Sequence, residues 1–208
     1  MDNIRSVGMR NICKKITSDL DIDMSKMTAL DFFAREGDWQ TSTLSDYVLE
    51  LEAWEVKEKH REKLIQNLPD NSIIRIGDSF KLSLDEQYKN KFDIIVFDNP
   101  AGCYGEKPYC EHFEALDFVQ RLIKKDFGIV IFNVKLSPFN FDKFPLWKQR
   151  REKYYGLPDT SSLELSDIKT FYKNKFTEMN FDVNFFFVEH RLQQADLYSF
   201  VVGLGERE

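Results

Sequence analysis

Long apolar segments are absent from this 208-residue chain, in which 42% of the residues are hydrophobic and 31% are charged. No run approaches the roughly 20 apolar residues that a membrane-spanning helix requires. The first 23 residues contain four aspartates and no apolar segment of the kind found in signal peptides. We therefore expect a cytoplasmic protein with no membrane partner.

Cysteine and excess positive charge are also scarce. The three cysteines, Cys13, Cys103 and Cys110, cannot all pair and lack the close spacing of a metal site, so we predict buried thiols and no bound metal. The net charge of −6 at pH 7 excludes a global positive field that would attract nucleic acid, which leaves only a local basic patch for that purpose. The chain length fits one domain with a substantial core.

Short apolar runs that end in an acidic residue recur at nearly even spacing. Four of these runs end at or near Asp31, Glu55, Asp78 and Asp98. Polar, helix-prone segments separate them, which is the pattern of a parallel sheet whose strands alternate with crossover helices. Because ligands bind beyond the carboxyl ends of the strands in such sheets, we expect the four carboxylates to line one crevice.

The order of the elements predicts a three-layer, Rossmann-like α/β fold with seven strands, mostly parallel. Five strand–helix units precede two strands whose short connection suits an antiparallel hairpin. The expected strands are 28–33, 49–55, 73–76, 93–97, 128–134, 183–189 and 198–204, and the expected helices are 41–48, 57–68, 80–88, 111–124 and 166–176. Residues 136–163 are interpreted as a long irregular loop. Residues 1–27 are predicted to form a helix or lid over a domain of residues 28–208.

The segment after the first predicted strand reads Leu30-Asp31-Phe32-Phe33-Ala34-Arg35-Glu36-Gly37. With the C-terminal hairpin, it resembles the class I S-adenosylmethionine-dependent methyltransferases, whose members that act on nucleic acids often read Leu-Asp-x-Phe-Ala-Gly-x-Gly here. The resemblance implies a cofactor, S-adenosylmethionine, whose methionine part the backbone approaches closely at small residues. The implied cofactor-binding residues in this segment are Asp31, Phe33, Ala34 and Gly37. Arg35 replaces the central glycine, so its side chain either crowds the cofactor or points to solvent.

Further cofactor contacts are implied after the second and third predicted strands. Glu55 is expected to accept hydrogen bonds from both ribose hydroxyls, as the analogous acid does in nucleotide-binding folds. The resemblance implies that Asp78 accepts from the adenine amino group, that the N–H of Ser79 reaches a ring nitrogen, and that Phe80 packs on the purine. The alternatives are a surface glutamate at Glu55 and a helix N-cap at Asp78.

The turn after the fourth predicted strand reads Asp98-Asn99-Pro100-Ala101-Gly102. Asn99-Pro100 matches the first half of the Asp/Asn/Ser-Pro-Pro-aromatic motif of amino-directed nucleic acid methyltransferases. The resemblance implies that Asp98, Asn99 and Pro100 face the methyl acceptor. The side-chain oxygen of Asn99 would orient an amino group for in-line attack, and Tyr104 would stack on the base. A simple turn with Asp98 as a cap is the alternative.

Basic and aromatic residues are interleaved between Lys143 and Tyr155. Because this segment follows the fifth predicted strand, it should lie at the same edge of the sheet as the cofactor. We expect its side chains to bind phosphates and stack on bases. The residues assigned to this role are Trp147, Lys148, Arg150 and Arg151. A solvated helix with its aromatic side chains turned inward explains the pattern equally well.

The expected activity is methyl transfer from S-adenosylmethionine to an amino nitrogen of RNA or DNA, with RNA preferred over DNA. A small-molecule N- or O-methyltransferase is the first alternative, and it is favoured by the net charge and by the incomplete Asn99-Pro100 motif. A non-catalytic scaffold of the same fold is the second alternative, because Arg35 departs from the family pattern.

Overall fold

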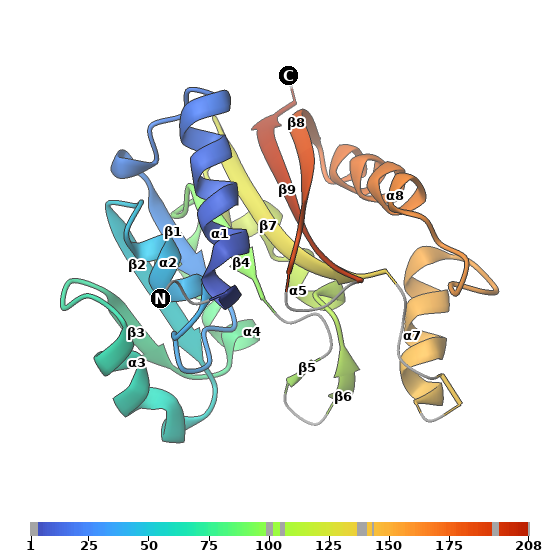
Figure 1. Ribbon diagram of the computed structural model, residues 1–208, viewed down its shortest axis with the longest axis horizontal. Helices are drawn as coiled ribbons and strands as arrows, with labels where there is room; N and C mark the ends of the chain where they lie inside the picture. The colour runs from blue at the N-terminus through green and yellow to red at the C-terminus, as the bar shows by residue number, and fades with distance from the viewer. Residues whose placement is uncertain are drawn as a thin grey trace.

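A seven-stranded sheet forms the centre of the molecule, which we describe from a computed structural model (Figure 1). The structure describes residues 4–98, 102–104, 107–136, 141–142, 144–192 and 196–207, and it describes residues 4, 5, 102–104 and 107–110 by their backbone only. Asn99 and Pro100 lie outside the described residues, and the side chain of Tyr104 does so too. The roles assigned to these three residues therefore stay predictions.

The strands have the order β3-β2-β1-β4-β7-β9-β8. They are β1 (Thr28–Asp31), β2 (Glu50–Glu55), β3 (Ile73–Ile76), β4 (Ile94–Phe97), β7 (Gly128–Lys135), β8 (Phe181–His190) and β9 (Leu197–Glu206). The pairs among β1, β2, β3, β4 and β7 are parallel, whereas β9 is antiparallel to both neighbours. The predicted Rossmann-like sheet with an antiparallel C-terminal hairpin is confirmed. Because β2 and β4 flank β1, the strand order reverses there, which marks the usual ligand position.

Helices cover both faces of the sheet. They are α1 (Ile4–Lys14), α2 (Gln40–Ser45), α3 (Arg61–Asn67), α4 (Ser79–Leu82), α5 (Phe113–Leu116), α6 (Val119–Leu122), α7 (Pro145–Tyr155) and α8 (Leu165–Glu178). The first three pack on an aliphatic face that includes Ala29 of β1 and Leu44 of α2. On the other face α5, α6 and α8 pack on an aromatic core that includes Leu30, Phe132 and Tyr172. Neighbouring residues of a strand thus face opposite layers, as the pleat requires.

Two segments differ from the sequence-based prediction. Residues 136–163 were expected to be irregular, but they contain α7, whose side chains at four-residue spacing, Trp147, Arg151 and Tyr155, are all buried. A two-stranded sheet, β5 (Gly102–Tyr104) and β6 (Lys107–Cys110), was not expected, and the predicted helix 111–124 is two short helices. Within the described residues, no helix has the length and apolar character needed to cross a membrane.

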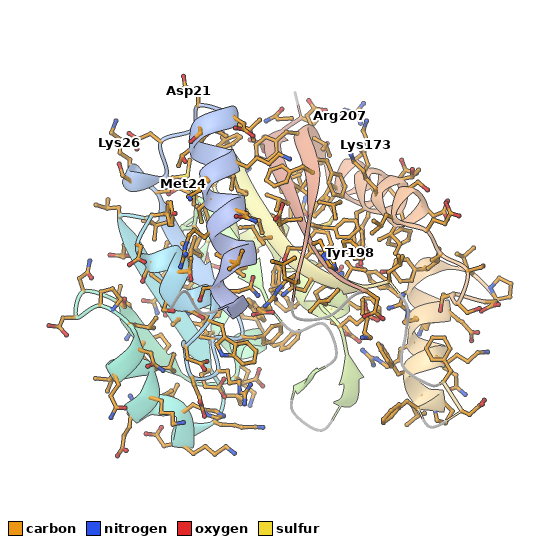
Figure 2. The ribbon with its side chains drawn as sticks, viewed as in Figure 1. Asp21, Met24, Lys26, Lys173, Tyr198 and Arg207 are labelled. Atoms are coloured by element: carbon orange, nitrogen blue, oxygen red, sulfur yellow. The ribbon has the colours of Figure 1, made fainter. Side chains whose placement is uncertain are left out.

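The N-terminal helix α1 is part of the folded core. It packs against α2 and β8. Ile12 and Cys13 near its end and Ile16 just after it are fully buried. The segment that joins α1 to β1 contains Asp21 and Lys26, which Figure 2 labels. It lies at one end of the molecule, and the strands β5 and β6 lie at the opposite end (Figure 1). Only the beginning of α1 therefore lies toward the carboxyl ends of the parallel strands, and a lid role for residues 1–27 stays a prediction.

Candidate active site

The loop between β1 and α2 is held to the neighbouring strand by its backbone. The N–H of Ala34 donates to the carbonyl oxygen of Trp54 at 2.9 Å, and the N–H of Gly37 closes a turn on the carbonyl oxygen of Ala34 at 2.8 Å. Ala34 is buried. This segment between β1 and α2, which we call the glycine loop, therefore turns tightly at the carboxyl end of β1, as predicted.

Arg35 adopts the backbone conformation that glycine would favour at this position. Its φ of 52° lies in the left-handed region, and its N–H donates to Oε2 of Glu55 at 3.0 Å. The side chain is exposed, with the guanidinium carbon 5.5 Å from the centroid of the Trp39 ring. The replacement of glycine thus keeps the loop backbone and directs the arginine side chain outward.

Gly37 is required by packing as well as by conformation. Its φ is 69°, and a Cβ atom there would lie 3.0 Å from Cδ2 of Leu64 and 3.2 Å from Cγ of Leu68. The glycine therefore lets the loop approach α3 closely. The predicted role of Gly37 in leaving room for the cofactor stays a prediction.

Glu55 joins the end of β2 to the glycine loop. Its two carboxylate oxygens accept hydrogen bonds from the N–H groups of Arg35 at 3.0 Å and Lys57 at 2.7 Å. Each oxygen retains a further lone pair, because an ionised carboxylate offers about four acceptor positions. Glu55 is buried at this edge and is not the surface glutamate of the alternative interpretation, and its contact with a ribose stays a prediction.

Ser79 and Asp78 connect the end of β3 to the end of β1. The hydroxyl of Ser79 donates to the carbonyl oxygen of Phe32 at 2.8 Å. Asp78 is exposed, and its Oδ1 accepts from the N–H of Phe80 at 3.0 Å, so it caps α4 as the alternative interpretation expected. Its Oδ2 accepts no hydrogen bond from the residues that the structure describes, and its contact with adenine stays a prediction. The rings of Phe80 and Phe33 lie 6.5 Å apart beside this edge.

Asp31 is the most deeply buried of the four predicted carboxylates. Its oxygens accept from the hydroxyl of Thr41 at 2.6 Å and from the N–H of Phe33 at 3.1 Å. Burial, with smaller contributions from the negative charges of Asp98 and Glu55, raises the pKa of Asp31 to about 7. The ends of β1, β2 and β4 thus bring three carboxylates within electrostatic range of one another.

Asp98 lies in a polar network on the other side of this edge. The guanidinium Nη1 of Arg191 donates to Oδ1 of Asp98 at 2.9 Å, and the amide of Asn133 donates to the same oxygen. Asn133 is itself held by the hydroxyl of Ser199 at 2.7 Å. Asp98 is therefore fixed by side chains from β7 and from the end of β8 immediately before the predicted acceptor turn.

Two of the four residues of the basic segment that were assigned to nucleic-acid binding are buried. Trp147 and Arg151 lie in the interior, where Nη1 of Arg151 pairs with Oε1 of Glu111 at 2.6 Å. Lys148 pairs with Glu152 at 2.8 Å. Arg150 pairs with Glu114. The pairs of Arg150 and Arg151 join α7 to the segment of Glu111 and Glu114, whereas the Lys148 pair lies within α7. The inward-turned helix of the alternative interpretation describes Trp147 and Arg151, and the roles assigned to Lys148 and Arg150 stay predictions.

Sequence reasoning missed three polar residues at this edge. Arg191 follows β8, and in the sequence it was visible only as one basic residue between the last two predicted strands. Asn133 was detectable as the one amide in the apolar strand Gly128–Lys135. Gln40 begins α2 with its side chain buried, and nothing in the sequence separated it from a solvent-exposed glutamine. Among the described residues no group of His, Cys, Asp and Glu could hold a metal ion.

Comparisons with known proteins establish the fold of the chain. No family model matches it, and no curated protein is similar in sequence. TYW2 of M. jannaschii, solved in complex with AdoMet, matches 100% of this chain and 78% of its own with a TM-score of 0.56 and 15% identity. A candidate RNA methyltransferase from Pyrococcus horikoshii matches 96% of this chain and 83% of its own, with a TM-score of 0.57 and 13% identity. Fibrillarin, a pre-rRNA processing protein of Methanococcus jannaschii, matches 90% of this chain and 70% of its own, with a TM-score of 0.57 and 15% identity.

This chain has the class I methyltransferase fold. The predicted fold resemblance is therefore confirmed across the full length of the chain. Identities of 13–15% establish the architecture alone, so the activity has to be argued from the residues at the edge of the sheet.

Proposed function

We propose that this protein is a methyltransferase that binds S-adenosylmethionine at the carboxyl ends of β1, β2 and β3. The observation that carries the proposal is the position of Glu55, which is held by the loop N–H groups of Arg35 and Lys57 and keeps acceptor capacity for the ribose hydroxyls. Asp78 and Phe80 would bind the adenine, and the AdoMet complex of the structurally similar TYW2 supports the same cofactor.

The residues at the edge fit the charge of this cofactor. The sulfonium group is a cation, and the carboxylates of Asp31 and Glu55, which accept main-chain N–H groups, provide negative charge at the ends of β1 and β2. When bound, the cofactor would supply the methyl group. The protein's own residues would hold both reactants in line and exclude water, and positioning of this kind accounts for much of the rate enhancement in bimolecular reactions.

The acceptor we propose is an amino nitrogen of RNA. Two observations support it: the predicted Asn99-Pro100 motif follows Asp98, and two proteins of the same fold are described by RNA methylation or pre-rRNA processing. A small-molecule acceptor is the second candidate, and a specific observation favours it. Lys148, Arg150 and Arg151 on α7 pair with Glu152, Glu114 and Glu111, which lowers the positive charge that this segment offers to the phosphates of RNA.

Calorimetry tests cofactor binding. We expect S-adenosylmethionine and S-adenosylhomocysteine to bind the wild-type protein, and the Glu55→Gln variant to bind both about tenfold more weakly because one charged acceptor is lost. Glu58→Gln is the matched control, since Glu58 is exposed and pairs only with Arg61 among the described residues. No heat from either ligand at high micromolar concentration would leave the non-catalytic scaffold as the answer.

Incorporation of radiolabelled methyl groups tests the acceptor. Total RNA, DNA and a metabolite pool are each incubated with the protein and labelled S-adenosylmethionine. We expect label in RNA. Label only in a small compound would make the protein a small-molecule methyltransferase.

A further inference from the structure

The side-chain amide of Gln40 is buried without a hydrogen-bond partner. Gln40 is 1% exposed, and neither Nε2 nor Oε1 has a partner within the part of the chain that the structure describes. A buried amide that lacks both its donor and its acceptor partner is costly, and native proteins leave few such groups. The missing partner is therefore expected to be a ligand that carries an acceptor and a donor close together.

The position of Gln40 links this amide to the proposed cofactor site. Gln40 is the first residue of α2 and comes three residues after Gly37. The next residue, Thr41, donates to Asp31 at the end of β1. Helical side chains lean toward the N-terminus of their helix, which for α2 is the glycine loop. A side chain with this lean lies on the glycine-loop side of α2.

The helix α1 covers Gln40 from the other side. The hydroxyl of Ser6 lies 3.4 Å from the carbonyl oxygen of Trp39, the residue that precedes Gln40. Leu44, one turn after Gln40, is fully buried in the aliphatic face together with Met9 of α1. The amide of Gln40 is thus buried close to the start of α1 and to the glycine loop.

We propose that Gln40 binds the amino-acid end of the cofactor, with Nε2 donating to the α-carboxylate and Oε1 accepting from the α-ammonium. An α-amino acid zwitterion needs one donor and one acceptor side by side, and a single carboxamide provides both. This inference rests on the proposed function, because it assigns a part of the same cofactor to a residue that the sequence analysis did not select.

The test compares two neutral thioethers. S-adenosylhomocysteine carries the amino-acid end, and 5′-methylthioadenosine lacks it. In Gln40→Met, which keeps the length of the side chain and removes the amide, we expect S-adenosylhomocysteine to bind ~10-fold to ~100-fold more weakly and 5′-methylthioadenosine to bind as it does to wild type. Gln66→Met on the exposed face of α3 is the matched control and should change neither affinity.

A thermal melt of the free protein provides a second readout with the opposite sign. Because Met replaces a buried amide that has no partner, the melting temperature of ligand-free Gln40→Met should be at least that of wild type. A residue that only supports the fold would instead lower stability and the affinity for both thioethers together, and that outcome overturns the inference. Unchanged affinity for S-adenosylhomocysteine also overturns it. If wild type binds neither thioether nor S-adenosylmethionine, the proposed function itself is wrong.

Discussion

Acidic side chains at the carboxyl edge of the sheet have different partners in its two halves. In the half formed by β1, β2 and β3, the carboxylates of Asp31, Glu55 and Asp78 accept hydrogen bonds from main-chain N–H groups. In the half that follows β4, the acids pair with cations, as Asp98 does with Arg191 and Glu111 with Arg151.

The two kinds of partner have different effects. Main-chain N–H groups shape a loop around the carboxylate, whereas cations neutralise its charge. A main-chain N–H orients a carboxylate but carries no net charge, so the first half stays anionic and suits a cationic ligand. An ion pair cancels the charge of both partners, so the second half offers little net charge to a phosphate backbone. The same residue type thus shapes the loop of the proposed cofactor site in one half and supports packing in the other.

The largest expected effect is in the second half, at the interior pair of Arg151 and Glu111. Arg151→Met leaves the Glu111 carboxylate buried without its cation, and removal of one partner of a buried pair typically costs about 3–5 kcal/mol of unfolding free energy. Chemical denaturation measures the loss. The double variant Glu111→Gln/Arg151→Met should recover part of it, because no buried charge remains. A single variant as stable as wild type would show that the pair does not hold α7.

Gly37 tests the geometry of the first half. Gly37→Ala places a Cβ in the left-handed region and against Leu64, with an expected loss of about 1–3 kcal/mol in unfolding free energy. Gly156→Ala is the matched control, because Gly156 has the same φ of 69° but no atom within 4 Å of the added Cβ. Denaturant titrations of both variants separate backbone strain from the clash. Equal losses would mean that contact with α3 contributes nothing.

Asp31 tests the concentration of negative charge in the first half. Its pKa is raised from 3.8 to about 7 in the folded protein, so the folded state binds more protons than the unfolded chain between these values. The unfolding free energy should therefore fall as pH rises from about 4 to about 7, by roughly 1 kcal/mol per pH unit, and level off above. The wild-type minus Asp31→Asn difference, from denaturation across this range, isolates the effect. A flat difference would contradict the burial of the Asp31 carboxyl group and its approach to Asp98 and Glu55.

Arg35 should produce the smallest effect. Arg35→Gly removes an exposed side chain and the strain of a left-handed non-glycine residue, but it adds chain entropy to the unfolded state, so unfolding free energy should change by less than about 1 kcal/mol. Calorimetry should give the wild-type affinity for S-adenosylmethionine. A clearly tighter complex would show that the arginine obstructs the site after all.

The first half of the site was largely predictable from the sequence. Central parallel strands are buried on both faces, so they read as apolar runs, and the acids at Asp31 and Glu55 mark where each run leaves the core. The turn at Gly37 was also visible, because a glycine follows the first run at a family-like spacing. The outward direction of Arg35 was left open, since it depends on the hydrogen bond to Glu55 across 20 residues.

The second half depends on contacts that no local pattern encodes. Arg151 and Lys148 lie three residues apart on one helix, yet Arg151 is interior because Glu111, 40 residues earlier, meets it there, whereas Lys148 pairs with Glu152 one turn away. Gln40 resembles any polar helix residue until α1 covers it.

By itself the amino-acid sequence determined the alternation of strands and helices, the antiparallel hairpin and the acids at the strand ends, because burial on a parallel sheet requires those apolar runs. Only the tertiary structure decided which charged side chains are neutralised and which polar groups are enclosed. Those outcomes depend on partners far away in the chain, and the energy of a buried charge or amide is set by its surroundings more than by its residue type.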